Sequence, residues 1–418
     1  MKWSGMPDND SDIVIVGGGV AGCALAARLA AGGLKVTVLE RESTYHDMVR
    51  GEAMVPWGFV EAIELGVAQS ILEADSMSVI TKMVPYDENL SVEQAQRMSK
   101  DLSTAVPGAP GVIGVGHPEL REALAQAATK AGATVIRGVR RCTIERAPHP
   151  SVTYEVDGET RTERCRLIVG ADGKQSSTRA AAGVSLSTTE ARVKLSGMLV
   201  DDGGVWDRSV TTIAIAGRNQ YIVIPRADNR LRLYVGRSTS DPEPLRGPAT
   251  ITEFLESYRT PIFPNFDDLA AATPIGPCAT FPMNDAWTDT PVVPGVALIG
   301  DAAGWSNPVT AQGLSISLRD ARILSEALLD NSTWTPQSLA GYSEERSARM
   351  ARLRFASALT DLLAGFCMPD RTARQSRMRR MLSQRPELGA ALGAVHSGPW
   401  AAPAEAYSPD ILATLALA

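Results

Sequence analysis

Residues 12–40, DIVIVGGGVAGCALAARLAAGGLKVTVLE, contain the pattern that decides the fold. The first five residues form the apolar, β-branched run that is typical of a buried strand. After three glycines, an Ala- and Leu-rich segment predicts a helix that stops at Gly32-Gly33. KVTVLE predicts a second strand, so the stretch is expected to form a βαβ unit with parallel strands and a right-handed crossover.

The glycines of this stretch match the dinucleotide-binding fingerprint G-x-G-x-x-G. Gly17 is expected to make the tight turn, Gly19 to let the backbone approach a pyrophosphate, and Gly22 to let the helix pack on the strand. The N–H groups of the helix start would bind the pyrophosphate. Glu40, about 20 residues on, would accept hydrogen bonds from ribose hydroxyls. The predicted nucleotide-binding residues here are Gly17, Gly19, Val20, Ala21, Gly22, Glu40 and Arg41.

Composition is that of an ordinary globular protein. The chain has 418 residues, of which 44% are hydrophobic and 21% charged. Lys and Arg total 41 against 47 for Asp and Glu, so the net charge of −6 provides no positive field to attract nucleic acid. The N-terminal MKWSGMPDNDSD has no apolar signal region, and no run approaches a membrane span. We therefore expect a cytoplasmic protein with no integral membrane segment.

The cysteines and histidines predict neither a disulfide framework nor a metal site. The five cysteines are widely spaced and include no C-x-x-C pair. The four histidines are scattered without the spacing of metal ligands, so no metal is expected.

Patterns along the rest of the chain predict an α/β protein in three parts. Two further apolar strands, RLIVGA and VALIG, continue the parallel sheet, whereas residues from about 187 to 280 alternate as antiparallel strands do. The predicted parts are a discontinuous dinucleotide-binding domain (1–85, 105–186 and 281–335), a substrate-binding domain with a mainly antiparallel sheet (86–104 and 187–280) and a helical C-terminal region (336–418).

Two clusters of turn residues follow the two apolar strands. They are ADGKQSSTR, residues 171–179, and GDAAG, residues 300–304. Either cluster alone could be a surface turn. Because the carboxyl ends of parallel strands are where such sheets bind ligands, we expect both to be ligand-binding loops.

The three motifs, in this order, resemble those of the class A FAD-dependent monooxygenases, the aromatic hydroxylase family with the para-hydroxybenzoate hydroxylase fold. The family's D-G-x-x-S-x-x-R and Gly-Asp motifs fall on Asp172, Gly173, Ser176, Arg179, Gly300 and Asp301. The resemblance covers nearly the whole chain. It implies a Rossmann-like FAD-binding domain with an inserted β-sheet, tightly bound FAD, and NAD(P)H as a transient reductant.

The resemblance also implies roles around the flavin ring. Asp301 would hydrogen-bond the ribityl chain, and Pro308 would lie beside the isoalloxazine. The backbone of Gln312, Gly313 and Leu314 would face the pyrimidine edge, where N–H donors stabilise negative charge on the reduced ring. Pro308, Gly313 and Leu314 are therefore the expected catalytic environment, and no general base can be identified.

Further FAD contacts are expected from Arg50, in the loop after the βαβ unit, and from His117 or Arg121 on one helix. A surface arginine and an ordinary helix-start histidine are the alternatives. The positions that depart from the family pattern are Gly304 (usually His), Ala311 (usually Gly) and Ser315 (usually Asn).

The implied reaction is insertion of one oxygen atom from O2 into a small organic substrate, aromatic or polyketide-like, through a flavin C4a-hydroperoxide. This is the chemistry of a hydroxylase of secondary metabolism, acting as a monomer or homodimer. Gly-Asp-Ala-Ala-Gly also resembles flavin-dependent isoprenoid reductases, so a reductase or dehydrogenase of an isoprenoid-like or unsaturated substrate is the alternative. A third hypothesis is a protein that holds FAD without catalysis.

Two expectations concern residues outside the FAD motifs. Tyr221 lies on a predicted strand that could line the substrate pocket, although core packing is the stronger interpretation. In the C-terminal region, arginines lie off an apolar helical stripe, and we expect them to form a solvated face, with a membrane-surface or partner helix as the alternative. These arginines are Arg346, Arg349, Arg352 and Arg354.

Overall fold

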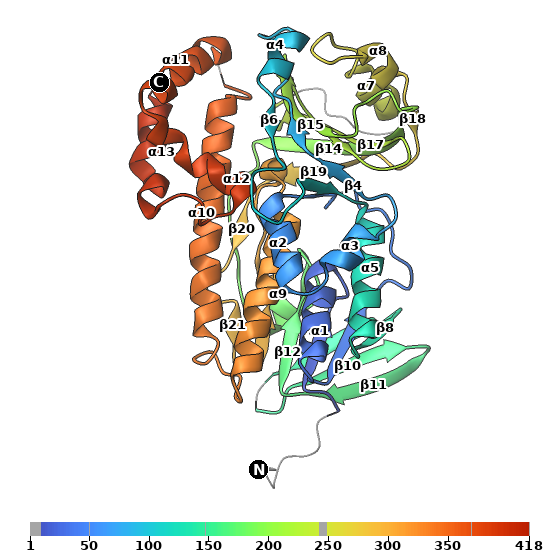
Figure 1. The fold of residues 1–418 in the computed structure, drawn as a ribbon. Helices are drawn as coiled ribbons and strands as arrows, with labels where there is room; N and C mark the ends of the chain where they lie inside the picture. Colours follow the sequence, from blue (N-terminus) through green and yellow to red (C-terminus); the bar gives the residue numbers. More distant parts are fainter. Residues whose placement is uncertain (1–9, 50, 147, 242–248, 369, 418) are drawn as a thin grey trace.

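A six-stranded sheet organises one half of the computed structural model, which describes residues 10–49, 51–146, 148–241, 249–368 and 370–417 (Figure 1). The strand order is β21-β22-β12-β1-β2-β8, and every neighbouring pair is parallel except β21 with β22. The quoted βαβ unit forms as predicted, with Ile13 opposite Val36. The strands are β1 (Ile13–Val16), β2 (Val36–Glu40), β8 (Thr134–Arg137), β12 (Leu167–Gly170), β21 (Val292–Val293) and β22 (Val296–Leu298).

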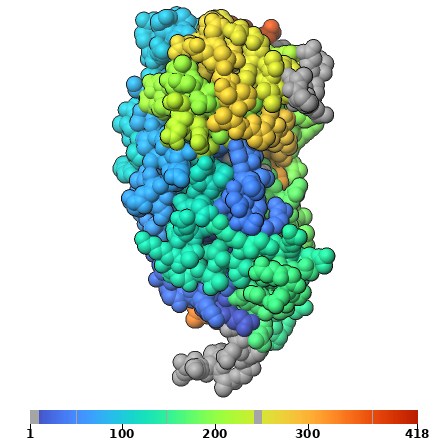
Figure 2. All heavy atoms as spheres, turned by 90° about the vertical axis from the view of Figure 1, so that its right-hand side faces the viewer, coloured from blue at the N-terminus to red at the C-terminus, as the bar shows by residue number. Residues whose placement is uncertain are grey.

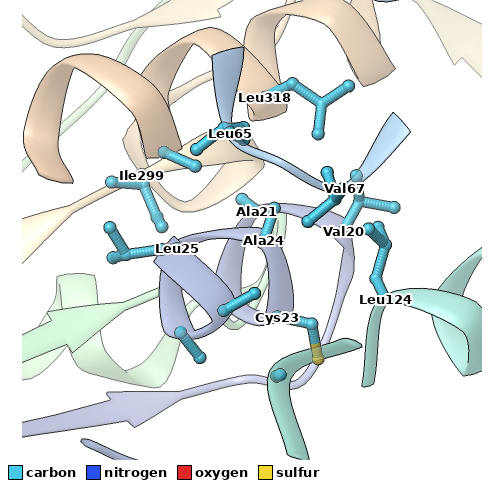
Figure 3. Packing of buried hydrophobic residues seen from close by; sticks show 14 of the residues in the cluster. Val20, Ala21, Cys23, Ala24, Leu25, Leu65, Val67, Leu124, Ile299 and Leu318 are labelled. Carbon is cyan, nitrogen blue, oxygen red and sulfur yellow. The ribbon is translucent and has the colours of Figure 1, made fainter. Parts of the chain in front are cut away.

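Helices cover one face of this sheet. The Ala-rich α1 is buried on most sides because α5 and α9 pack against it, and Figure 3 shows Ala21 and Ala24 of α1 in the cluster to which Leu124 of α5 and Leu318 of α9 contribute. Gly22 permits close packing on β1, since a Cβ there would lie 2.1 Å from the Gly17 carbonyl oxygen. The helices of this layer are α1 (Val20–Ala31), α2 (Pro56–Glu64), α3 (Ala68–Leu72), α5 (His117–Lys130) and α9 (Gly313–Asp330).

A three-stranded antiparallel sheet and one short helix cover the other face. Val14 and Val16 of β1 pack there against Val152 of the small sheet. Its hairpin turns at Asp157-Gly158, where both residues have positive φ, as a tight hairpin turn requires. The elements are β9 (Arg140–Glu145), β10 (Ser151–Val156), β11 (Glu159–Arg164) and α6 (Ser177–Ala182).

The inserted sheet occupies one end of the molecule (Figure 2). Its order is β18-β14-β17-β16-β15-β5-β6, with β19 also pairing with β14, and only β15 with β5 is parallel among its ladders. Two helices cover one face of it, around Tyr221, Tyr258 and Phe263. The elements are β5 (Lys82–Met83), β6 (Lys100–Asp101), β14 (Val193–Asp201), β15 (Val210–Ala216), β16 (Asn219–Pro225), β17 (Arg230–Ser238), β18 (Thr273–Pro274), β19 (Ala279–Met283), α4 (Val92–Arg97), α7 (Ala249–Glu256) and α8 (Phe266–Ala270).

Two small sheets lie between the halves, and the C-terminal helices pack along one side (Figure 1). The small sheets consist of β3 (Ala53–Met54), β7 (Val112–Gly114) and β4 (Ser78–Ile80), and of β13 (Ser187–Thr188) and β20 (Ala286–Trp287). The C-terminal helices are α10 (Ala340–Ala364), α11 (Arg371–Gln384), α12 (Ala394–Ser397) and α13 (Pro409–Ala416). Among the described helices, none has the length and hydrophobicity needed to cross a bilayer.

The expectation of a solvated arginine face on α10 is wrong for two of its members. Arg346 is 1% exposed and Arg349 is 0% exposed. Both are drawn inward by the buried carboxylate of Asp320 on α9. Arg352 and Arg354 are partly exposed, and their guanidinium groups stack on the rings of Trp400 and Trp287.

Candidate functional site

A cavity of about 1080 Å³ runs from the carboxyl ends of the parallel strands to the inserted sheet and the C-terminal helices. Most of the predicted site residues line it, although they come from distant parts of the chain. These residues are Gly17, Gly19, Val20, Ala21, Glu40, Arg41, His117, Arg121, Asp172, Gly173, Gly300, Asp301, Pro308, Gly313 and Leu314.

Three predicted site residues do not line this cavity, and a fourth is not described. Gly22 packs against Gly17 instead, which is the structural role that the fingerprint assigns to it. Gln312 and Tyr221 turn their side chains elsewhere. Arg50 lies outside the described residues.

The glycine loop has the shape that a pyrophosphate needs. Gly19 precedes α1, no side chain caps that helix start, and a Cβ added at Gly19 would meet open space. The free N–H groups of the helix start therefore face the cavity. Gly17 has φ of 110°, and a Cβ there would lie 2.4 Å from the Ala171 carbonyl oxygen, so only glycine fits this turn.

Glu40 and Arg121 are held together beside the loop. The Glu40 Oε2 atom accepts a hydrogen bond from the Gly18 N–H at 2.7 Å and lies 3.2 Å from an Arg121 guanidinium nitrogen. Arg121 also stacks 3.9 Å from the centre of the Tyr45 ring. Both charged groups are buried at the cavity wall, so they are fixed before any ligand binds. This arrangement suits recognition of ribose hydroxyls.

The Asp172 loop is built around its own carboxylate. Asp172 accepts hydrogen bonds from the Ser176 hydroxyl and from the Thr178 N–H and hydroxyl, at 2.5, 3.0 and 3.1 Å, and so supports the first turn of α6, whose N-cap is Ser176. Arg179 donates to the Ala302 carbonyl at 3.0 Å, which ties this loop to the Gly-Asp loop. The D-G motif thus positions two stretches of the cavity wall.

The Gly-Asp loop leaves the Asp301 carboxylate available. Asp301 lines the cavity, and its carboxylate has no hydrogen bond or ion pair with any residue that the structure describes, although its backbone carbonyl accepts from the Gly304 N–H. The loop itself is held from behind: the Gly300 N–H donates to Asp320 at 2.8 Å, and Arg346 donates to the Ala303 carbonyl at 2.9 Å. A free acceptor on a fixed loop fits a polyol such as the ribityl chain of FAD.

Asp320 is the centre of a buried ion cluster that sequence reasoning missed. Its carboxylate lies 3.0 Å from Arg346 and 2.6 Å from Arg349, and Asp320 itself is 0% exposed. Burial opposes the charge of Arg349, but Asp320 and Glu345 together raise the pKa of this guanidinium. The sequence feature that could have indicated this cluster is Asp320, which lies on the apolar side of one predicted helix, together with Arg346 and Arg349, three residues apart on the next helix.

The start of α9 faces the cavity at Gly313 and Leu314, with Pro308 nearby. Gly313 is exposed and a Cβ there would meet open space. The Gln312 side chain is buried, however. It accepts from the Trp57 indole N–H at 3.0 Å and donates to the Val395 carbonyl at 3.0 Å. Gln312 therefore links the helix start to α2 and to the C-terminal segment.

The departures from the family pattern have local explanations. At Gly304, φ is 113° and a Cβ would lie 2.3 Å from the Ala286 carbonyl oxygen, so this backbone excludes a larger side chain. Ala311 has φ of 54°, a left-handed conformation that favours glycine. Ser315 lies directly against Gly58 of α2, where little space remains for a longer residue.

Beyond the flavin motifs the cavity becomes mainly apolar. Its walls there come from β14 to β17, β19 and the C-terminal helices: Leu195, Ile213, Ile222, Ile224, Tyr234, Phe281, Leu363 and Leu392. The polar lining residues at this end include Thr211, Thr360, Lys100 and His396. An apolar wall with few polar groups is typical of a small-molecule site.

Tyr221 lies on the opposite face of the same sheet. Its hydroxyl donates to the Ser257 carbonyl at 2.8 Å, and its ring packs edge-on against Phe263. Because successive strand residues point to opposite faces, the neighbours Ile222 and Ile224 face the cavity instead.

Comparison with known proteins agrees with the motifs. A family model described as FAD binding domain matches residues 10–356. Ubiquinone hydroxylase UbiL of Rhodospirillum rubrum is 27% identical over 396 residues, which are 89% of this chain and 86% of that enzyme. Squalene monooxygenase SE1 of Panax ginseng is 25% identical over 77% of this chain, but the match spans only 60% of that enzyme.

Solved structures share the fold. The ternary complex of aklavinone-11 hydroxylase with FAD and aklavinone has a TM-score of 0.68 at 18% identity, over 87% of this chain and 70% of that one. OxyS anhydrotetracycline hydroxylase from Streptomyces rimosus has a TM-score of 0.70 at 20% identity, over 93% and 75% of the two chains. At these identities the likeness concerns architecture alone.

Proposed function

This chain belongs to the FAD binding domain family of FAD-dependent monooxygenases, and on that premise we propose that it inserts one oxygen atom from O2 into a small, largely apolar organic substrate. NAD(P)H is the proposed reductant, and an aromatic or polyketide-like compound is the proposed substrate class. The single observation that carries the proposal is the continuity of one cavity from the FAD motifs to an apolar chamber.

FAD would be held along the first part of this cavity. The start of α1 would bind the pyrophosphate, Glu40 the ribose and Asp301 the ribityl chain, while Gly313 and Leu314 would donate N–H groups to the ring. When bound, FAD supplies the electron transfer and oxygen activation. The protein's part is to hold the substrate beside the ring and to keep water away from it.

The apolar chamber is suited to holding such a substrate and to excluding water. Side chains such as Ile222, Ile224 and Phe281 offer no hydrogen bonds to water, and the other face of β16, which carries the two isoleucines, packs on α7 and α8. The ubiquinone hydroxylase and squalene monooxygenase relatives are named for substrates with long hydrocarbon portions, which is consistent with such a chamber. An apolar chamber disfavours highly charged substrates.

The experiment begins with the purified protein and its flavin content. The proposal would be refuted if the protein neither retained nor took up FAD. In the Asp301→Ala variant we expect weaker FAD retention, because the free acceptor at the cavity wall is lost. Asp330→Ala, at the exposed end of α9, is the matched control and should retain FAD normally.

Isotope labelling then separates oxygenation from the competing reduction. With isotopically labelled O2, NADH or NADPH and candidate substrates, a monooxygenase places one labelled atom in the product and the other in water. A reduced, unlabelled product formed without oxygen would instead identify a flavin-dependent reductase.

A further inference from the structure

The C-terminal segment forms part of the chamber wall, outside the region that the family model matches. That match ends at residue 356, yet Thr360, Leu363, Leu392, Val395 and His396 all line the cavity. Side chains in this segment are therefore placed to distinguish this protein's substrate from those of other members of the family.

The position of this segment is set by the flavin side of the site. The Gln312 side chain, at the start of α9, donates to the Val395 carbonyl at 3.0 Å. Gly398 lies against Trp57 of α2, where an added Cβ would be 3.3 Å from the Trp57 Cβ. These contacts bracket α12, which lies beside α2 (Figure 1). The contacts with Gln312 and with Trp57 thus fix the helix that carries His396 in the cavity wall.

His396 is a buried polar side chain that lines the cavity and has no hydrogen-bond partner within the described part of the chain. It is 7% exposed, and neither ring nitrogen forms a hydrogen bond with the residues that the structure describes. Burial, with a smaller contribution from Lys100, lowers its pKa to about 3, so the imidazole is neutral near pH 7. A neutral imidazole carries one N–H donor and one nitrogen acceptor. Buried polar groups are normally satisfied, and since His396 lines the cavity, a group bound in the cavity can supply the partner.

We propose that His396 hydrogen-bonds a hydroxyl or carbonyl group of the substrate and thereby selects molecules with an apolar body and one such polar group. The lining at this end is mainly apolar, and the imidazole is one of its few polar groups, with Thr211, Thr360 and Lys100. This inference rests on the proposed function and names a substrate-contacting residue for it. Lys100 lines the same end of the cavity; the residue as a whole is exposed, but partial burial lowers the pKa of its ammonium group.

Matched pairs of probes test the assignment on the FAD-loaded protein. The pairs are 1-naphthol with naphthalene and 4-nonylphenol with nonylbenzene, and calorimetry measures their dissociation constants. We expect the wild type to bind each phenol about 10-fold more tightly than its hydrocarbon, the size of one buried hydrogen bond. In His396→Leu the ratio should fall below about 2-fold. His396→Gln, which can donate and accept, should restore part of it.

His149→Leu is the control, because His149 is exposed and does not line the cavity. It should keep the full discrimination. An unchanged ratio in His396→Leu, or no preference for either phenol in the wild type, would overturn the proposal. Because binding is measured without turnover, a protein that discriminates but does not oxygenate would refute the proposed function and leave the role of His396 intact.

Discussion

Replacing Asp320 by asparagine tests the buried ion cluster behind the Gly-Asp loop. The substitution keeps the shape of the side chain but removes the charge that faces both Arg346 and Arg349. Removing one partner of a buried pair costs roughly 3–5 kcal/mol because the other charge stays buried. Glu345 still lies 3.1 Å from Arg349, and backbone carbonyls still accept from Arg346. We therefore expect Asp320→Asn to lower the free energy of unfolding by the lower end of this range, about 3 kcal/mol.

This free energy converts to a modest shift in melting temperature. An unfolding entropy of about 2.1 cal/mol/K per residue gives roughly 0.9 kcal/mol/K for a chain of 418 residues that unfolds as one unit. Asp320→Asn should therefore lower Tm by about 3 °C in a calorimetric scan of the FAD-free protein. FAD retention should fall as well, because the Gly300 N–H loses its charged acceptor and the loop that carries Asp301 is less well held.

Asp330→Asn is the matched control, since it makes the same change at the exposed end of the same helix. It should leave both Tm and flavin content near the wild-type values. The reasoning would be refuted if Asp320→Asn melted within about 1 °C of this control, because the two buried guanidinium groups would then not depend on Asp320.

Four further predictions test other parts of the structure. Gly22→Ala should abolish FAD retention, measured as the ratio of flavin to protein, because the new Cβ would lie 2.1 Å from the Gly17 carbonyl oxygen; normal flavin content would contradict this packing. Ala311→Gly should raise Tm by about 1 °C, since it relieves roughly 1 kcal/mol of left-handed backbone strain, and an unchanged or lower Tm would count against that strain. His396 has its pKa lowered to about 3 in the folded protein from 6.5, so the unfolded chain binds the extra proton between these values and stability falls as pH falls below 6.5. His396 should contribute up to about 1.4 kcal/mol per pH unit to this fall in the free energy of unfolding. The contribution should be absent in His396→Leu when urea unfolding is compared at pH 7 and pH 5. Tyr221→Phe should bind the phenol probes as the wild type does, because its hydroxyl is bonded to Ser257 away from the cavity, and a weakened phenol preference would contradict that placement.

The parts of the site that local sequence could predict are those built from contiguous residues. The βαβ unit, its glycine turn and Glu40 lie within residues 12–40, so chain connectivity alone brings them together. The loops at Asp172 and Asp301 were also predictable, because each follows an apolar strand and parallel strands end at one edge of the sheet. For these residues the local sequence pattern predicts their positions in the fold almost completely, whereas their roles in binding FAD stay predictions.

Packing between distant segments decided the rest. Period-two alternation shows that β16 has two faces, but only the covering helices α7 and α8 determine that Tyr221 is turned away and Ile222 faces the cavity. Arg346 and Arg349 look like surface residues until α10 is placed against Asp320, whose charge makes their burial possible. Nothing near residue 396 marks its histidine as part of a site. Long-range contacts through Gln312 bring it to the chamber, and such contacts depend on how completed helices pack together, which no local pattern encodes.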